Sequence, residues 1–98
     1  MDVTNADAGL ARAEQDAGAT VGHGDAVDRG FRKVMQVIRQ ALDERDLYAM
    51  RSLRCEKLEG QPDNVRSLRI NRQWRLIVEI RGVSPNKNIG VLRVEDYH

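Results

Sequence analysis

The sequence has little of what marks several large classes of protein. Its one cysteine, Cys55, allows no internal disulfide, and no apolar run approaches the roughly 20 residues that a membrane helix needs. The first ten residues lack the basic start and apolar core of a signal peptide. There is no CxxC or HExxH motif, and His23 and His98 do not by themselves make a metal site. We therefore expect a cytoplasmic protein with no metal, no other cofactor and no membrane partner.

The 98 residues of the chain suffice for one domain, 1–98, with its own hydrophobic core.

The charge of the chain is unevenly distributed. Residues 1–50 carry six basic and nine acidic side chains, a net charge of −3, whereas residues 51–98 carry ten and six, a net charge of +4. Eight of those ten are arginines, which bind phosphate through a planar fork. This excess favours an anionic partner, although a solvated sheet face with salt bridges is the alternative.

The first half of the chain has the apolar spacing of helices. Residues 2–5 are predicted to form an edge strand, and the alanine-rich stretch 6–16 predicts a short helix. Asp25 offers an N-cap for the next segment. Apolar residues then recur chiefly at steps of three and four, which predicts an amphipathic helix over 25–42. Its apolar stripe is Val27, Phe31, Val34, Met35, Ile38 and Leu42. Residues 43–50 predict a short helical turn.

The second half alternates between apolar and polar residues, as strands do. We predict strands over 52–60, 65–71, 73–80 and 89–98, separated by turns rich in Pro, Asp, Asn and Gly. The short connections favour an antiparallel meander. Helices followed by strands indicate an α+β fold, with two N-terminal helices packed on one face of a twisted, mainly antiparallel sheet. The other face would then be open.

The alternation also assigns side chains to the two faces. Arg75 falls on the open face, and so does one of Arg66 and Arg69. On the last strand we expect two sets of side chains on opposite faces, Leu92, Val94, Asp96 and His98 on one and Val91, Arg93, Glu95 and Tyr97 on the other. A row of arginines beside a strand that ends Asp-Tyr-His is a plausible RNA-cleaving surface.

Three other residues with aromatic or reactive side chains are assigned structural roles. Trp74 shares a face with the apolar residues of its strand, so it is predicted to lie in the core and not to act as a base-stacking platform. Cys55 is expected to be a buried or half-buried side chain, and not a nucleophile, because no histidine is near it in sequence. His23, between glycines, is predicted to be a loop residue.

Three segments of the second half, SLRCEKLEG, SLRINRQWRLIV and VEDYH, occur in an order and spacing that resembles a toxin family. The resemblance is to the HigB-type branch of the RelE/ParE toxin superfamily, also called plasmid maintenance system killer proteins. That family reads approximately LxxEKLxG, then YSIRLNDQWRI, then a terminal DYH. The likeness covers almost the whole chain and is strongest from about Leu47 onward. It implies a RelE-like toxin fold and a protein that enters the ribosomal A site and cuts mRNA.

The resemblance also implies partners. These would be a HigA-type antitoxin with a helix-turn-helix domain, the ribosome and mRNA, with operator DNA contacted only indirectly through the antitoxin. The chain departs from the family in one region. Gln61-Pro62-Asp63-Asn64 replaces the usual Asp-Arg-Lys-Gly turn, Arg66 replaces a tyrosine, and Arg72 replaces an aspartate. These changes bear on substrate contacts more than on the fold.

The family's functional residues map onto positions near the end of the chain. Its terminal triad falls on Asp96, Tyr97 and His98, and its two arginines fall on Arg69 and Arg75. Glu56 stands where some members carry a catalytic histidine, although an exposed glutamate in a salt bridge is the alternative. The other candidates for contacts with RNA are Lys57, Arg54, Arg66, Arg72 and Arg93.

RNA cleavage without a metal needs a base, an acid and cations. The base activates the neighbouring 2′-OH, cations stabilise the phosphorane, and the acid protonates the leaving 5′-oxygen. His98 is suited to acid or base work because an unperturbed imidazole titrates near neutral pH. Asp96 would orient it or act as the base, Glu56 is the other candidate base, and Tyr97 would stack on a nucleobase. Arg69 and Arg75 would clamp the scissile phosphate.

Two other functions stay open at this stage. One is a ParE-like toxin that inhibits DNA gyrase without cutting RNA, against which the terminal Asp-Tyr-His and the arginines argue. The other is an inactive toxin-like protein that only binds an antitoxin, which the altered segment 61–66 would permit.

Overall fold

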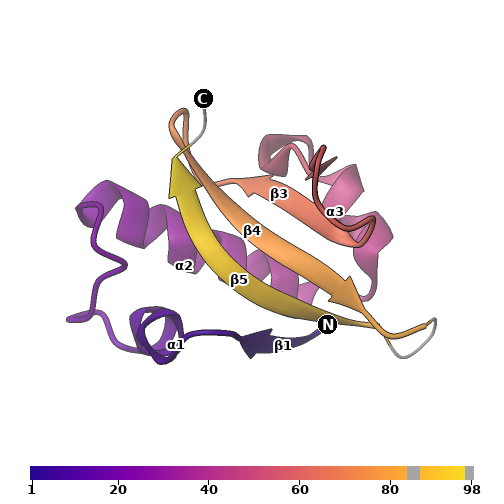
Figure 1. Cartoon of the computed structure of the whole chain (residues 1–98). Helices are drawn as coiled ribbons and strands as arrows, with labels where there is room; N and C mark the ends of the chain where they lie inside the picture. The colour runs from indigo at the N-terminus through magenta and orange to yellow at the C-terminus, as the bar shows by residue number, and fades with distance from the viewer. Residues whose placement is uncertain (84–86, 97–98) are drawn as a thin grey trace.

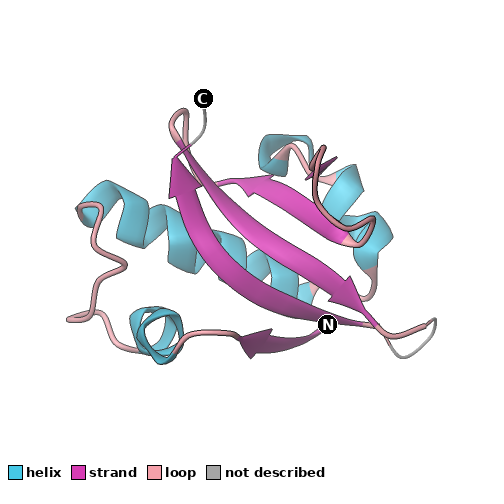
Figure 2. Ribbon diagram, viewed as in Figure 1, coloured by secondary structure: helices cyan, strands magenta, loops and turns pink. Residues whose placement is uncertain are grey.

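A five-stranded sheet with helices on one side forms the molecule (Figure 1, Figure 2). The computed structural model describes residues 1–83 and 87–96. The elements run in the order β1 (Asp2–Asn5), α1 (Ala8–Gln15), α2 (Asp25–Gln40), α3 (Glu44–Ala49), a 3₁₀ turn η1 (Arg51–Leu53), β2 (Glu56–Lys57), β3 (Val65–Arg69), β4 (Trp74–Arg81) and β5 (Asn88–Asp96). The α+β class expected from the sequence is confirmed.

The sheet has the strand order β1-β5-β4-β3-β2. Strands β2 to β5 pair antiparallel in sequence order, which is the predicted meander, and β1 lies parallel to β5 at the edge. Short turns permit only antiparallel neighbours, whereas the parallel β1–β5 pair needs the rest of the chain as its connection.

A bulge in β5 changes the predicted faces of that strand. Leu76 is in register with Val94 and Ile77 with Arg93, but Val78 is in register with Val91, so Leu92 is an extra residue. Consequently Val91 and Val94 both pack on the hydrophobic core. The assignment of Val91 to the same face as Arg93 was therefore wrong, because simple alternation assumes an unbroken register.

Helix α2 lies behind β4 and β5 in Figure 1 and supplies much of the core. Its apolar stripe buries four large side chains that were predicted from their spacing, Phe31, Val34, Met35 and Ile38. Together with residues of the other helices and the central strands they form one hydrophobic cluster. The helices therefore cover one face of the sheet, which we call the helix face, and the opposite face is called the open face.

Both ends of α2 differ from the prediction. Its N-cap is Gly24 and not Asp25, which is the first helical residue. The helix ends at Gln40, and Leu42 is 91% exposed instead of closing the apolar stripe. Ala41 takes an extended backbone, and the N–H of Leu42 donates to Asp46 at 2.8 Å. The start of α3 therefore takes the chain away from the helical path.

The predicted strand 52–60 is mostly not a strand. Leu53 lies in η1 and is 4% exposed, because it turns into the core. Arg54 follows with a left-handed backbone (φ 44°), which interrupts any extended segment. Only Glu56 and Lys57 pair with β3.

Side chains of α2 hold the α1–α2 connection. Arg32 donates from Nε to the carbonyl of Ala13 at 3.1 Å, and from Nη2 to the carbonyls of Ala17 and Ala19. Arg39 forms an ion pair with Glu14 of α1. The bond to Ala13 satisfies a carbonyl that the end of α1 leaves open, and the other contacts hold the connection and α1 against α2.

The described residues contain neither a membrane-spanning helix nor a cluster of metal ligands. No helix in residues 1–83 and 87–96 is long and apolar enough to cross a membrane. Within the same ranges, no group of three or more His, Cys, Asp and Glu side chains is placed to hold a metal ion.

Candidate functional site

Two candidate arginines lie on neighbouring strands of the open face. Arg69, the last residue of β3, is directly in register with Arg75 near the start of β4. Arg75 is in turn in register with Glu95 of β5. Side chains that are in register on neighbouring antiparallel strands have Cβ atoms about 4.5–5.5 Å apart. Two guanidinium groups and one carboxylate therefore originate from one row across the sheet, which we call the arginine row.

Arg75 differs from the expectation in its exposure. Alternation along β4 directs it away from Leu76 and the core, as predicted, but it is 5% exposed and does not emerge into solvent. Arg69 is half-buried, so it is the more accessible of the pair. A charge held at low exposure acts through a lower effective dielectric and is felt more strongly by a bound anion. The arginine row thus combines an accessible donor with a buried charge.

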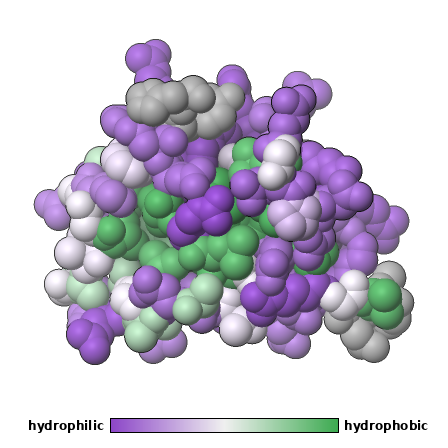
Figure 3. All heavy atoms as spheres, in the orientation of Figure 1, coloured by the Kyte–Doolittle hydropathy of each residue, from purple (hydrophilic) through white to green (hydrophobic). Residues whose placement is uncertain are grey.

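A second row lies beside the first. Glu56, Ser67, Ile77 and Arg93 are in register across β2 to β5. Arg93 also forms an ion pair with Glu95 at 2.5 Å, which links the two rows along β5. Figure 3 views the open face and shows hydrophobic atoms at its centre with hydrophilic atoms around them. The structure thus brings Arg69, Arg75, Glu56 and Arg93 to one face.

Three other candidates lie on the other side of their strands. Lys57 and Arg66 are in register with each other, one position out of phase with Glu56 and Ser67. Arg66 donates to the hydroxyl of Tyr48 in α3 and to the carbonyl of Asp63. Lys57 lies 3.4 Å from Asp63 in an exposed ion pair.

Asp96 is the third of these. It is in register with Trp74, and its Oδ2 accepts a hydrogen bond from the side-chain amide of Gln73 at 3.1 Å. It therefore lies at the same end of the sheet as the arginine row, one residue beyond Glu95. Tyr97 and His98, which complete the predicted triad, lie outside the described residues.

Arg54 and Arg72 lie in connecting segments. Arg54 is exposed after η1, and Arg72 is exposed in the turn between β3 and β4. The turn itself is held by Asn71, whose side-chain oxygen accepts from the N–H groups of Gln73 and Trp74 at 2.9 Å each. Arg72 is thus carried near the arginine row by a structured turn.

The prediction for Trp74 was wrong. It is only half-buried and lies outside the core cluster. Trp74 is the first residue of β4, so it lies at the end of the sheet, whereas the core begins with Leu76. The imidazole of His23 stacks on its indole, with ring centroids 3.9 Å apart and an angle of 20° between the planes. The predicted loop residue His23 therefore joins two parts of the chain that are distant in sequence.

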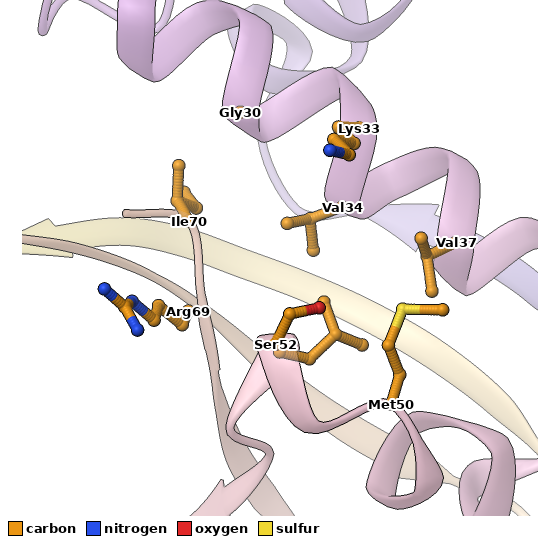
Figure 4. Close-up of a pocket in the computed structure, with 9 residues that line it drawn as sticks. Gly30, Lys33, Val34, Val37, Met50, Ser52, Arg69 and Ile70 are labelled. Carbon is orange, nitrogen blue, oxygen red and sulfur yellow. The ribbon is translucent and has the colours of Figure 1, made fainter. Parts of the chain in front are cut away.

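A hollow of about 140 Å³ lies on the helix side of the sheet, between α2 and η1 (Figure 4). It is lined by Gly30, Lys33, Val34, Val37, Met50, Ser52, Leu53, Arg69 and Ile70. Most of these side chains are apolar, and Arg69 is the only residue that it shares with the arginine row. The hollow is therefore a surface distinct from the open face.

Cys55 is half-buried, as expected. Burial raises the pKa of its thiol from the usual 9.0 to about 11. A thiol with so high a pKa is almost wholly protonated at neutral pH and is a poor nucleophile.

Two residues near these candidates were not among the predicted site residues. Glu95 stands between Arg75 and Arg93, and the spacing Arg-Val-Glu on one strand would have indicated an ion pair on one face. His23 had no local signal, because its contact with Trp74 depends on the tertiary fold.

Comparisons with known proteins bear on the fold. A scan against protein-family models gives no match, and a search of curated proteins gives no relative. Among solved structures the chain is similar to a YoeB/ParE toxin from Agrobacterium tumefaciens, with a TM-score of 0.62 and 17% sequence identity over 100% of both chains. That similarity confirms the predicted toxin-like fold, whereas the HigB-type branch stays a prediction from sequence.

Proposed function

We propose that this chain is the toxin of a type II toxin–antitoxin system and that it cleaves mRNA on the translating ribosome. The observation that carries the proposal is the register pairing of Arg69 with Arg75 on the open face of a sheet with a toxin-like fold. Two guanidinium groups on adjacent strands suit a phosphate, which accepts several charge-assisted hydrogen bonds at once. The electropositive second half of the chain supports an anionic substrate.

The proposed mechanism needs no bound cofactor. The 2′-OH next to the scissile phosphate attacks phosphorus, and the bond to the 5′-oxygen breaks. Arg69 and Arg75 would stabilise the extra negative charge of the phosphorane. His98, Asp96 and Glu56 are the candidates for the base and the acid, and Tyr97 is a candidate for stacking on a base.

The proposal includes the partners that the sequence resemblance implies. A HigA-type helix-turn-helix antitoxin would neutralise the toxin, and operator DNA would be contacted only through that antitoxin. Ribosomes and mRNA would be the targets, which places the activity in the cytoplasm. Co-expression with the neighbouring open reading frame should yield a complex that co-purifies and restores growth.

Induced expression tests the proposal most directly. We expect growth arrest, and mapping of RNA 5′ ends should show new ends at in-frame positions of translated messages. An Arg69→Ala variant at matched expression serves as the control for catalysis. Intact mRNA during arrest would overturn the nuclease.

A ParE-like toxin is the second candidate, because the similar solved structure is itself a YoeB/ParE toxin. In that case growth arrest would come with blocked DNA replication and intact mRNA. The remaining candidate is an inactive protein that binds an antitoxin, and it predicts no arrest at all. The altered segment 61–66 supports this candidate. Arg66 stands at the position where the family carries a tyrosine, and its side chain donates a hydrogen bond to the hydroxyl of Tyr48.

His98 provides a sharp test of the proposed chemistry. Loss of a general acid or base lowers a rate by about 100- to 10,000-fold, so His98→Gln and deletion of His98 should both abolish killing. Loss of a terminal residue with no part in the chemistry, by contrast, usually changes stability by no more than about 0.5 kcal/mol. Growth arrest and thermal melts of both variants distinguish a catalytic His98 from one that is only a terminal residue. Full activity of the deletion would exclude His98 from the chemistry.

A further inference from the structure

We infer that His23 and Trp74 form a binding site for an unpaired nucleobase at the end of the sheet that carries the arginine row. The inference rests on the proposed function, since it names a contact for the same RNA substrate. It assigns a ligand to two residues that the sequence had placed in a loop and in the core.

The rings already form the beginning of a stack. Their centroids are 3.9 Å apart and their planes differ by 20°. Trp74 is half-buried beneath His23, whereas His23 is exposed. The outer face of the imidazole can therefore accept a third flat ring, and every nucleobase has such a face.

The loop that carries His23 is built to hold it. Asp28, 6% exposed, accepts hydrogen bonds from the N–H of Val21 at 2.9 Å and the hydroxyl of Thr20 at 3.1 Å. The N–H of Gly22 donates to Thr20 Oγ1 at 2.9 Å. Gly22 and Gly24 have φ of 92° and 99°, a backbone conformation that glycine adopts without steric cost. The position of His23 is thus prepared before any ligand binds, which reduces the entropy lost on binding.

The stack also lies close enough to the arginine row for one nucleotide to place its base on the stack and its phosphate on the row. Trp74 and Arg75 are successive residues of β4, so their side chains point to opposite faces at the same end of the strand. Trp74 is in register with Asp96 and Arg75 with Glu95. A strand of RNA that crosses the start of β4 would present a phosphate to the arginine row and a base to His23.

Stacking is better served here than elsewhere on the described surface. Phe31 is completely buried, and the ring of Tyr48, which is 46% exposed, is restricted in how it can turn toward a base because Arg66 donates to its hydroxyl. Within residues 1–83 and 87–96 the His23–Trp74 pair is the only stack of two rings.

The sole tryptophan makes the site directly observable. Intrinsic fluorescence of Trp74 should change saturably when the purified protein is titrated with a short single-stranded oligoribonucleotide. An abasic ribose-phosphate chain of the same length, which carries the same charge without bases, should bind more weakly and leave the fluorescence nearly unchanged. Equal responses to the two chains, or no response to either, would overturn the inference.

Variants of His23 separate base binding from loop anchoring. His23→Ala should weaken binding of the oligoribonucleotide by about 5- to 150-fold, the range for losing one stacked base, whereas His23→Phe should retain most of the affinity. Leu42→Ala, at an exposed position that follows the far end of α2, is the matched control. A His23→Ala protein that melts at a lower temperature but binds RNA as tightly as the parent would reduce His23 to a loop anchor.

The titration is independent of cleavage. If the protein arrests growth without cutting RNA, the proposed function is wrong, but the titration still tests whether His23 and Trp74 bind a base. Conversely, unchanged RNA affinity in His23→Ala, together with normal mRNA cleavage in cells, would overturn this inference and leave the proposed function standing.

Discussion

Arg75 carries its charge at a position where little of the side chain reaches solvent. It is 5% exposed, beside Arg69 on one neighbouring strand and Glu95 on the other. A buried guanidinium contributes both to stability and to the local electrostatic field. Removing it leaves the neighbouring charged groups without their partner, which destabilises the fold. The two arginines of the pair should therefore respond differently to substitution.

We expect Arg75→Ala to lower both mRNA cleavage and the melting temperature. Loss of one preorganised donor typically costs about 100- to 1,000-fold in rate. Arg69→Ala should lower cleavage by a similar factor with a smaller change in melting temperature, since Arg69 is more accessible. Cleavage assays with translating ribosomes and thermal melts of both variants check this. Unchanged cleavage by a folded Arg75→Ala protein would remove Arg75 from the site.

Asp28 is the second residue whose burial has consequences. Its pKa lies below the ordinary carboxyl value, chiefly because the N–H of Val21 donates to it, with the hydroxyl of Thr20 and the nearby charges of Arg32 and His23 assisting. A carboxyl group whose pKa is lowered by folding adds stability above its unfolded pKa, and that stability is lost as the pH falls through the folded value.

Asp28→Ala should therefore destabilise the protein most at neutral pH. We expect a loss of about 1–3 kcal/mol in the free energy of unfolding, because two partly buried hydrogen bonds to a charged acceptor are lost. The difference from the parent should narrow as the pH falls below the ordinary value of 3.8. Urea unfolding at several pH values measures it, with the exposed Asp25→Ala as the control. A difference that stays constant across that range would contradict the assigned role.

Among the elements, α2 is positioned by a close approach to the β3–β4 turn. A Cβ added at Gly30 would lie 2.7 Å from Cγ2 of Ile70 and 3.3 Å from its carbonyl oxygen. The first distance is well inside van der Waals contact, so the helix can approach Ile70 only where it carries no side chain. Gly30 therefore sets the spacing of α2 and the sheet beside the hollow shown in Figure 4.

Gly30→Ala should reduce stability even though alanine is the better helix former. The gain in helix propensity is about 1 kcal/mol, whereas overpacking costs about 1–3 kcal/mol. The control is Gln36→Ala on the exposed side of α2, which should leave stability unchanged or raise it slightly. Chemical denaturation of both variants is the measurement, and a stabilised Gly30→Ala protein would show that Ile70 moves aside easily.

Over the whole molecule, one hydrophobic cluster joins all the helices to the central strands. It includes Leu10 of α1, Phe31 of α2, Leu47 of α3, Leu76 of β4 and Val91 of β5. Within the part of the chain that the structure describes, no helix packs on a hydrophobic cluster of its own that would keep it folded once the sheet is lost. Small domains built in this way usually unfold in one cooperative step.

Unfolding should therefore follow a single transition by two independent probes. Far-UV circular dichroism reports on the helices and strands, and Trp74 fluorescence reports on the end of the sheet and the contact with His23. We expect the two curves in urea to coincide. A fluorescence change at lower urea would show that the loop around His23 opens before the rest of the molecule.

Local patterns in the sequence predicted most of the architecture, but neither the 3₁₀ turn that replaces the start of the strand expected over 52–60 nor the parallel pairing of β1 with β5. The stripe of Phe31, Val34, Met35 and Ile38 follows from the 3.6-residue period of a helix, and the strands follow from alternation. Their short connections allowed only antiparallel neighbours, so the meander was predictable too. The pairing of Arg69 with Arg75 was within reach for the same reason, because a tight turn separates their strands.

Only the tertiary structure decided the features that depend on residues distant in the chain. The end of α2 at Gln40, the bulge at Leu92 and the burial of Arg75 follow from competing contacts that no periodicity contains. The stack of His23 on Trp74 is the clearest case, because a loop before α2 and the first residue of β4 meet only after the sheet has formed against the helix. A sequence pattern records the period of each element, whereas the contacts between elements depend on how their surfaces fit together.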